Sequence, residues 1–237
     1  MSAASEAPPV LEVEDLSAGY GRSQVLFGLS LRAPRTGAVA VLGRNGAGKS
    51  TLLKALAGEL RAWGGEIRFD GARSNEQPPE RRARAGIGYV PQEEAVFARL
   101  SVRENLLLGA AGQPDRHGIP EVLDLFPKLA QRIDQQAATL SGGETFMASL
   151  ALALGLADTV QAEAGGIELD TLFVDEGFGS LDADTLDDVL DVVDTLRTGG
   201  RTVGLVSHVE RMRQEIGVRL EVRKDRRGSS LAVHDGA

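Results

Sequence analysis

The 237-residue chain contains no cysteine, which excludes a disulfide framework and any zinc site built on thiolate ligands. It begins without the basic and then apolar run of a signal peptide. No apolar stretch approaches the ~20 residues that a membrane-spanning helix needs, and the longest runs only over Leu150–Ala157. Internal repeats and coiled-coil heptads are also lacking. These absences predict a cytoplasmic chain that meets a membrane only through a partner.

A positive charge balance is lacking as well. The formal net charge is -8, so the chain has no general attraction for nucleic acids or anionic membranes. Two local basic stretches, Arg81–Arg84 and Arg223–Arg227, are predicted to be solvated faces rather than binding sites. With 42% hydrophobic and 25% charged residues, the composition is that of an ordinary globular protein with a sizeable core. The length fits one domain, or one domain with a small lobe.

Hydrophobic periodicity predicts strands that alternate with helices. Met1–Pro9 is small and polar, which predicts a disordered lead to a single domain over 10–237. Strands are predicted within 10–31, at 38–42, from Ile67, at 172–174 and at 202–206. Helices are predicted over Leu52–Leu60 with a stop at Gly64-Gly65, from Ser101, from Ser141, and over 186–196. Such alternation is typical of an α/β fold with a mainly parallel sheet and helices on both faces.

Two capping boxes mark helix starts in the middle of the chain. Ser101 is followed by Glu104, and Ser141 by Glu144, the spacing at which a hydroxyl and a carboxylate satisfy each other's backbone N–H groups. This stretch predicts a helical subdomain at about 92–157.

Gly43-Arg44-Asn45-Gly46-Ala47-Gly48-Lys49-Ser50 matches the G-x-x-x-x-G-K-[ST] pattern between a predicted buried strand and a helix. Glycines let backbone N–H groups close around a phosphate, and the helix N-terminus adds a positive dipole. Lys49 reaches the β- and γ-phosphates, and Ser50 offers a hydroxyl to Mg²⁺. A chance match arises in about one chain in a hundred of this length. The residues predicted to bind ATP here are Gly43, Asn45, Gly46, Ala47, Gly48, Lys49, Ser50 and Thr51.

A second glycine motif, Leu140-Ser141-Gly142-Gly143-Glu144, opens a predicted helix. Two glycines in a first turn cost about 1 kcal/mol each relative to alanine. They make sense where an anion, here a γ-phosphate, must approach the backbone at a helix N-terminus. This motif resembles the signature of ATP-binding cassette (ABC) proteins.

The other elements of that family follow in order. Tyr20 is similar to the aromatic residue that stacks on adenine, although a strand Tyr can equally be a packing residue. Gln92 resembles the Q-loop, Leu172–Glu176 the Walker B strand, Ser180–Asp182 the D-loop, and Ser207-His208 the switch histidine. The resemblance implies catalytic roles for Glu176, His208, Gln92 and Lys49, Mg²⁺ ligation by Ser50, Gln92 and Asp175, and further ATP contacts from Tyr20, Ser141, Gly142, Gly143 and Asp182.

The resemblance also implies a P-loop NTPase fold with an antiparallel β subdomain and a helical subdomain. In such ATPases two ABC subunits, identical or different, stack head to tail. Each ATP then lies between the phosphate loop of one chain and Ser141–Gly143 of the other. Asp175 holds Mg²⁺ and Glu176 polarises the attacking water, while Gln92 and His208 sense the γ-phosphate.

Two resemblances indicate different functions for the ATPase. Residues 10–144 resemble the ATP-binding subunits of branched-chain amino acid importers, on Gly86–Gln92, Leu100–Leu106 and Leu125–Leu129. Residues 140–237 resemble the C-terminal ATPase lobe of SbcC/SMC-like DNA-repair ATPases, on Ser141–Ala157, Asp170–Asp182 and Gly200–His208. The chain therefore looks like a chimera joined near the signature motif.

Repair ATPases of that kind carry a long coiled coil between their lobes, whereas Gln92 and Ser141 are only 49 positions apart here. We therefore expect an importer ATPase, held at the inner face of the cell membrane by a permease on its helical lobe. The alternative is a repair ATPase acting with a nuclease; a nucleic acid partner is not expected but is left open. A stand-alone regulatory or ribosome-associated cassette usually carries two cassettes, and this chain carries one.

Overall fold

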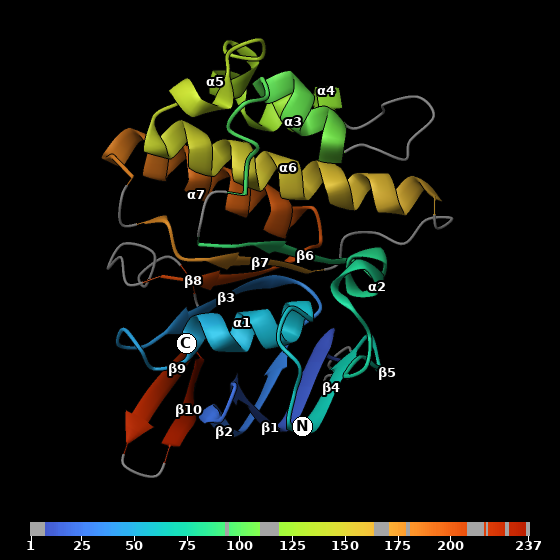
Figure 1. Ribbon diagram of the computed structural model, residues 1–237, viewed down its shortest axis with the longest axis vertical. Helices are drawn as coiled ribbons and strands as arrows, with labels where there is room; N and C mark the ends of the chain where they lie inside the picture. The colour runs from blue at the N-terminus through green and yellow to red at the C-terminus, as the bar shows by residue number, and fades with distance from the viewer. Residues whose placement is uncertain are drawn as a thin grey trace, which may run out of the picture.

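The computed structural model describes residues 8–92, 95–109, 119–163, 171–178, 181–207, 216, 218–225 and 228–235. It forms stacked layers: helices above, a six-stranded sheet, one helix beneath it, and a second sheet at the base (Figure 1). The six-stranded sheet has the order β10-β9-β3-β8-β7-β6 and is parallel except for the β9–β10 pair. Its strands are β3 (Gly37–Leu42), β6 (Ile87–Val90), β7 (Thr171–Asp175), β8 (Thr202–Val206), β9 (Val218–Asp225) and β10 (Gly228–Asp235).

The base sheet is antiparallel, with the order β2-β1-β4-β5. Its strands are β1 (Leu11–Tyr20), β2 (Ser23–Ala33), β4 (Gly64–Phe69) and β5 (Ala72–Arg73). The predicted α/β class, mainly parallel sheet and separate antiparallel sheet are all confirmed. The hairpin of β9 and β10 was not predicted. It is part of the six-stranded sheet, in which β3 pairs with β9 on one side and with β8 on the other.

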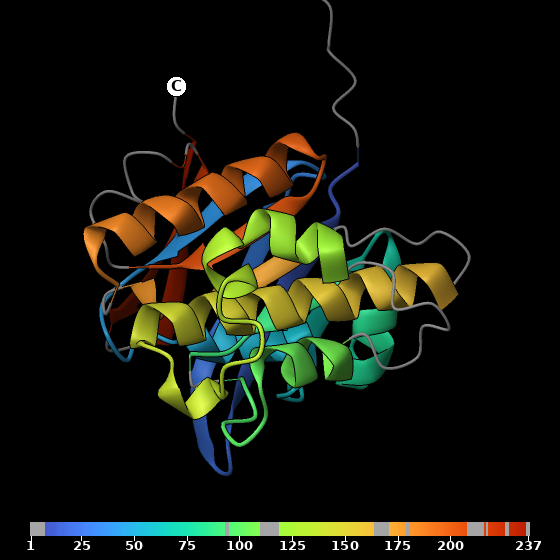
Figure 2. The same cartoon turned by 90° about the horizontal axis from the view of Figure 1, so that it is seen from above.

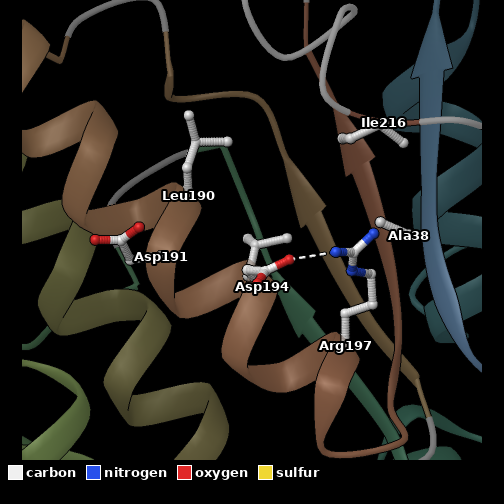
Figure 3. Close-up of a pocket in the computed structure, with 7 residues that line it drawn as sticks. Ala38, Leu190, Asp191, Asp194, Arg197 and Ile216 are labelled. Atoms are coloured by element: carbon white, nitrogen blue, oxygen red, sulfur yellow. Dashed lines mark hydrogen bonds and ion pairs between the residues drawn. The ribbon is translucent and has the colours of Figure 1, made fainter.

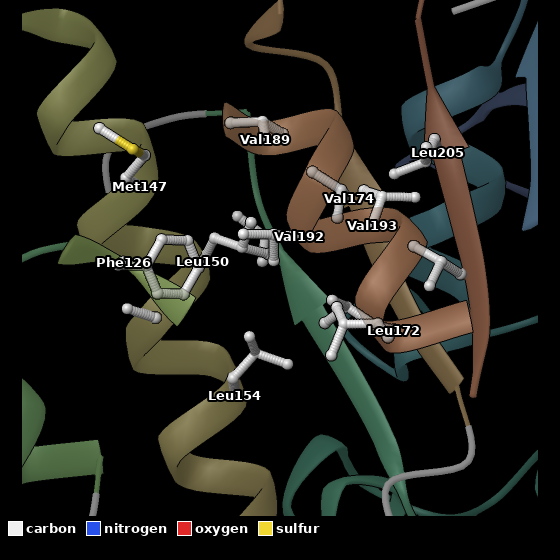
Figure 4. Close-up of a cluster of buried hydrophobic side chains, with 14 of the residues drawn as sticks. Phe126, Met147, Leu150, Leu154, Leu172, Val174, Val189, Val192, Val193 and Leu205 are labelled. Carbon is white, nitrogen blue, oxygen red and sulfur yellow. The ribbon is translucent and has the colours of Figure 1, made fainter. Parts of the chain in front are cut away.

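Two apolar cores lie on opposite faces of the six-stranded sheet. On the upper face, α6 (Gly142–Glu163) and α7 (Ala183–Thr198) both cross the strands (Figure 2). Figure 4 shows side chains of α6 and α7 packed against those of β7 and β8, with Phe126 beside α6. The labelled members of this cluster are Phe126, Met147, Leu150, Leu154, Leu172, Val174, Val189, Val192, Val193 and Leu205. All residues of β7 and β8 are buried, as expected of central parallel strands covered on both faces.

The lower core is centred on α1 (Lys49–Ala57), which lies between the two sheets and buries Leu52, Leu53 and Leu56. The predicted end of this helix at Gly64-Gly65 is wrong. The helix ends at Ala57 because Gly58 adopts a left-handed conformation with φ 88°, a common helix C-cap. Leu60 lies beyond the helix, and Gly64 begins β4.

The prediction that all of Arg81–Arg84 is a solvated face is also wrong at Arg82, on α2 (Pro79–Arg84), which is only 2% exposed. Its Nη1 donates to the carbonyls of Ala55 and Leu56, both at 2.7 Å. Burial lowers the pKa of Arg82. A guanidinium with several donors can satisfy the last carbonyls of α1 and place a positive charge at the negative end of its dipole. Arg82 therefore fixes the end of α1 opposite the phosphate loop.

The remaining helices lie over α6, away from the sheet (Figure 1). They are α3 (Val102–Gly109), α4 (Ile119–Leu125), α5 (Pro127–Ala130) and a short 3₁₀ turn (Ala137–Thr139). The first capping box is confirmed: the Ser101 N–H donates to the Glu104 carboxylate at 2.7 Å, and the Glu104 N–H donates to the Ser101 hydroxyl at 3.1 Å. Within the described part of the chain, no helix combines the length and apolarity needed to cross a bilayer.

Replacing Arg82 tests its role at the end of α1. We expect Arg82→Met to lower the free energy of unfolding by about 1–3 kcal/mol, because buried carbonyls lose their donors. Urea denaturation measures the change. The exposed neighbour Arg81→Met is the control and should stay within about 0.5 kcal/mol of the parent. Equal stability of the two variants would contradict the role.

Candidate functional site

The loop over 43–50 joins the end of β3 to the start of α1, as the sequence predicted. Gly48 caps the helix with φ 106°, a backbone conformation that favours glycine. α1 begins directly after Gly48, and a Cβ at Gly46 would meet no atom within 4 Å, so the start of the helix borders open space. This arrangement is suited to an anion.

The ammonium of Lys49 lies at the mouth of this loop. The side chain is 4% exposed, and its Nζ donates to the carbonyl of Gly43 at 3.1 Å. The same Nζ lies 3.1 Å from Oε1 of Glu176. Lys49 is therefore held within reach of both the loop and the catalytic candidate.

Asp175 and Ser50 meet although 125 positions separate them. The Ser50 hydroxyl donates to Oδ1 of Asp175 at 3.0 Å. Burial raises the pKa of Asp175, and the hydrogen bonds from Ser50 and Tyr89 act against this rise. A hydroxyl and a carboxylate are oxygen donors of the kind that Mg²⁺ takes, together with phosphate oxygens and water. No group of three or more His, Asp or Glu suited to a metal ion occurs among the described residues. The pair thus fits an ion that phosphates help to hold.

Glu176 follows β7 in a left-handed conformation with φ 56°, unusual for a residue other than glycine. Backbone strain of this kind persists where the surroundings fix it, often at functional sites. The Glu176 N–H donates to the carbonyl of Val206 at 3.2 Å. Its carboxylate lies between Lys49 and the amide of Gln92, whose Nε2 donates to Oε2 at 3.2 Å. Gln92 thus contacts the catalytic candidate, and its predicted role as a Mg²⁺ ligand stays a prediction.

Lys49, Ser50, Gln92 and Glu176 share one open cleft of about 440 Å³, and Asp175 adjoins it through its hydrogen bond with Ser50. It is lined by Val25, Asn45, Gly46, Gly48, Lys49, Ser50, Thr51, Gln92 and Glu176. A smaller cleft of about 190 Å³ lies between α7 and β3 (Figure 3). There Asp191 and Asp194 would repel a phosphate, and Arg197 is already paired with Asp194. The phosphate loop is therefore the candidate nucleotide site.

Tyr89 is a site residue to which the sequence reasoning gave no role. Its hydroxyl donates to Oδ2 of Asp175 at 3.2 Å. Burial and the charge of Asp175 raise the pKa of Tyr89, so the phenol keeps the proton that it donates. The signal that could have identified it was its place near the carboxyl end of β6, the strand next to β7.

The signature residues lie at the start of α6. The Ser141 N–H donates to the Glu144 carboxylate at 2.9 Å, and the Glu144 N–H donates to the Ser141 hydroxyl at 3.3 Å, so the second capping box is confirmed. A side chain at Gly142 would meet no atom within 4 Å, whereas a Cβ at Gly143 would lie 2.9 Å from Thr185. Packing within the chain therefore explains Gly143 but not Gly142.

Ser141 and Gly142 are exposed, and neither is among the residues that line the phosphate-loop cleft. The chain thus does not bring its own signature motif to its own phosphate loop.

Two further predicted residues, Asp182 and Tyr20, are not among those that line the cleft. Asp182 caps α7, and its carboxylate accepts from the Thr185 N–H at 2.8 Å. Tyr20 is 48% exposed at the end of β1, so its ring is accessible for stacking. His208, like Ser180, lies outside the described residues.

Comparison with known proteins gives one family and two kinds of relative. The sequence profile of the family described as ABC transporter matches residues 26–161. The SbcC component of the nuclease SbcCD from Vibrio cholerae is 58% identical over 99 residues, which is 42% of this chain and 10% of that protein. The chain thus spans about a tenth of the length of the curated relatives it matches.

Solved structures share the whole fold. The ATP-binding subunit of an ABC transporter is 26% identical, with a TM-score of 0.73 over 90% of this chain and 85% of the other. A nucleotide-free ATP-binding cassette from an ABC transporter is 20% identical, with a TM-score of 0.80 over 97% of this chain and 92% of the other.

The pH dependence of stability tests the cap on the signature helix. Partial burial raises the pKa of Glu144, but hydrogen bonds from Ser141 and the ion pair with Arg132 outweigh it and leave the pKa below its ordinary value. A carboxyl group whose pKa is lower in the folded protein than in the unfolded chain stabilises the fold at pH values above its unfolded-state pKa. This stabilisation is lost as the pH falls through the folded-state pKa. We expect Glu144→Gln to be less stable by about 1 kcal/mol at neutral pH.

The difference should shrink as the pH falls below about 4.3, the ordinary pKa of a glutamate in the unfolded chain. It should disappear once the pH is below the depressed pKa of the folded state, where the carboxyl is protonated in both states. Urea denaturation from neutral to acid pH measures it. Asp124→Asn, an exposed change on α4, is the control and should track the parent. A deficit that persists in acid would contradict the ionic cap.

Proposed function

The chain belongs to the ABC transporter family and is an ATPase of the ABC type, and from that premise we propose that it works as a head-to-tail dimer that drives a membrane permease. The observation that carries the dimer is the separation of the two ATP-binding motifs within one chain. The phosphate-loop cleft is lined without Ser141 or Gly142, and these stand exposed at the start of α6. A symmetric pair places the signature helix of each protomer at the cleft of the other.

The residues of the cleft divide the work of hydrolysis. Amides at the start of α1 and the ammonium of Lys49 bind the phosphates. Ser50 and Asp175 would hold Mg²⁺, which supplies positive charge to the phosphate oxygens. Tyr89 orients Asp175 through its hydrogen bond.

Glu176 orients the attacking water and accepts its proton. At the same time the water oxygen bonds to the γ-phosphorus, and the bond from the γ-phosphorus to the β-phosphate oxygen breaks. The products are ADP and phosphate. The 3.1 Å ion pair between Lys49 and Glu176 exchanges for one between Lys49 and phosphate, which frees the carboxylate for water. Gln92 contacts Glu176 and therefore reports on this exchange. His208 is assigned the role of a second sensor of the γ-phosphate, on the family resemblance alone.

Coupling to a permease, of amino acid importer type, is supported by the compact helices α3–α6. They connect β6 to β7 and begin soon after Gln92, so a partner that rests on them also acts on the site. The 26% identity to a transporter ATP-binding subunit over 90% of the chain agrees with this role. The partner would hold the chain at the inner face of the cell membrane.

A second candidate is a DNA-repair ATPase acting with a nuclease. It is favoured by the 58% identity to the SbcC component of the nuclease SbcCD, although this extends over only 99 residues. Stimulation of ATP turnover separates the two: duplex DNA should leave the rate unchanged and a reconstituted permease should raise it. The reverse pattern would replace the transport proposal with the repair one.

Removing the charge of Glu176 tests the hydrolytic role. We expect Glu176→Gln to bind ATP yet turn over at least about 100-fold more slowly, because the general base is lost. With Mg-ATP it should accumulate as a dimer, measured by light scattering after size-exclusion chromatography. The exposed Asp184→Asn on α7 is the control and should hydrolyse at the parental rate. Parental turnover by Glu176→Gln would refute the assignment.

A further inference from the structure

The ring of Phe146, on α6, lies directly against the backbone that follows Glu176. A Cβ placed on Gly177 would be 2.7 Å from Cε2 of Phe146 and 2.8 Å from Cδ2, closer than real contacts allow. Phe146 also meets Phe178 edge to face, with ring centroids 5.1 Å apart and planes at 65°. The aromatic ring thus fills the space that a side chain at Gly177 would occupy.

This contact holds a strained piece of chain. Glu176 and Gly177 are consecutive residues in left-handed conformations, with φ 56° and 98°. A pair of this kind persists only when neighbouring atoms fix it. Phe178 is 2% exposed, so the chain on the far side of Gly177 is anchored in the core. Phe146 closes the near side, and together they determine where the Glu176 carboxylate points.

The other end of the contact is the signature motif. Phe146 stands four positions after Gly142 and therefore on the same face of α6, one turn along the helix. Gly143 packs against Thr185 at the start of α7, so the first turn of α6 is tightly fitted. A shift of Ser141 and Gly142 is carried by the rigid helix to Phe146, and from there to Gly177.

We propose that Phe146 is a positioning residue that couples the signature end of α6 to Glu176. The proposal rests on the head-to-tail dimer proposed above. In that dimer, Ser141 and Gly142 of a chain touch the ATP held by its partner, whereas Glu176 acts on the chain's own ATP. The contact between Phe146 and Gly177 therefore links the two ATP sites, so that each Glu176 is best aligned when the other site is filled.

Truncation of the ring gives the first test. Phe146→Ala, with Phe146→Leu as the milder change, should lower kcat by about 10-fold, since a small misplacement of a catalytic group has effects of this size. The Kd for ATP should stay within about 2-fold of the parent, because the phosphate loop is untouched. The Hill coefficient for ATP should fall toward one. A merely structural role would not change cooperativity in the folded protein.

Leu190→Ala is the matched control. Leu190 is a partly buried apolar residue on α7 that packs on the same core, and it is not among the nearest neighbours of a Cβ at Gly177. It should retain the parental kcat and Hill coefficient, even where its melting temperature falls as far as that of the Phe146 variants. A control that loses cooperativity to the same extent would overturn the proposal.

A double-mutant cycle tests the contact itself. Gly177→Ala alone places a methyl group against the ring and should also lower kcat by about 10-fold. In the Phe146→Ala background the clash with the ring is removed and only the backbone strain of alanine at φ 98° remains, so the double variant should lose well under the about 100-fold expected of independent changes. Losses that multiply would overturn the coupling.

Failure of this inference is distinguishable from failure of the proposed function. If only this inference fails, the parent still hydrolyses ATP and dimerises in its presence, and the Phe146 variants keep the parental kcat and cooperativity. Failure of the dimer proposal would instead show as an absence of ATP-dependent association in the parent and in Glu176→Gln.

Discussion

The parallel pairing of β3, β8 and β7 is the constraint on which the site depends. Parallel strands end at the same edge of a sheet, so the loop after β3 and the carboxylates after β7 meet there although 125 positions separate Ser50 from Asp175. Burial of β7 and β8 on both faces fixes the strand ends, and α1 is clamped at its far end by Arg82. The polar groups of the cleft are therefore held in place by apolar packing on either side of the sheet.

The ion pair between Lys49 and Glu176 follows from this arrangement. Both side chains are mostly buried, at 4% and 14% exposed, and each is also bonded to a neighbour, Lys49 to the Gly43 carbonyl and Glu176 to Gln92. A phosphate that enters the loop competes for the same ammonium. Binding of a phosphate to the Lys49 ammonium would thus release the Glu176 carboxylate from the same ammonium.

Local chemistry made much of the fold and site predictable. The phosphate loop, the apolar strand before Asp175 and the two capping boxes are each specified within a few neighbouring residues, and their strands and helices were found where predicted, except that the helix after the phosphate loop ends earlier, at Ala57. What the sequence could not supply was contact between distant segments. Arg82 looked solvated because its partners, the last carbonyls of α1, leave no trace in the sequence around it. The contacts of Tyr89 with Asp175 and of Phe146 with Gly177 depend on the same long-range packing.

The two kinds of relative share the ABC-type ATPase and differ in the partner with which that ATPase works. On the proposed mechanism, the phosphate loop, Asp175 and Glu176 would hydrolyse ATP in the same way whichever partner the ATPase acts on. The proposed permease would instead contact α3–α5, which are not among the elements that line the cleft. This separation explains how a chain can combine a repair-like sequence stretch with transporter-like architecture within one working fold.

Mixing two inactive variants tests the shared site most directly. Lys49→Ala removes the phosphate-binding cation but keeps the signature, and Ser141→Arg blocks the signature but keeps the phosphate loop. In a head-to-tail dimer of one of each, one composite site is intact, which gives an equal mixture at most about a quarter of the parental ATPase rate. The empty second site should lower this rate by about 10-fold more, the loss expected of Phe146→Ala, and the mixture should still hydrolyse ATP well above either variant alone. A mixture that stays as inactive as its components would contradict a site formed by two chains.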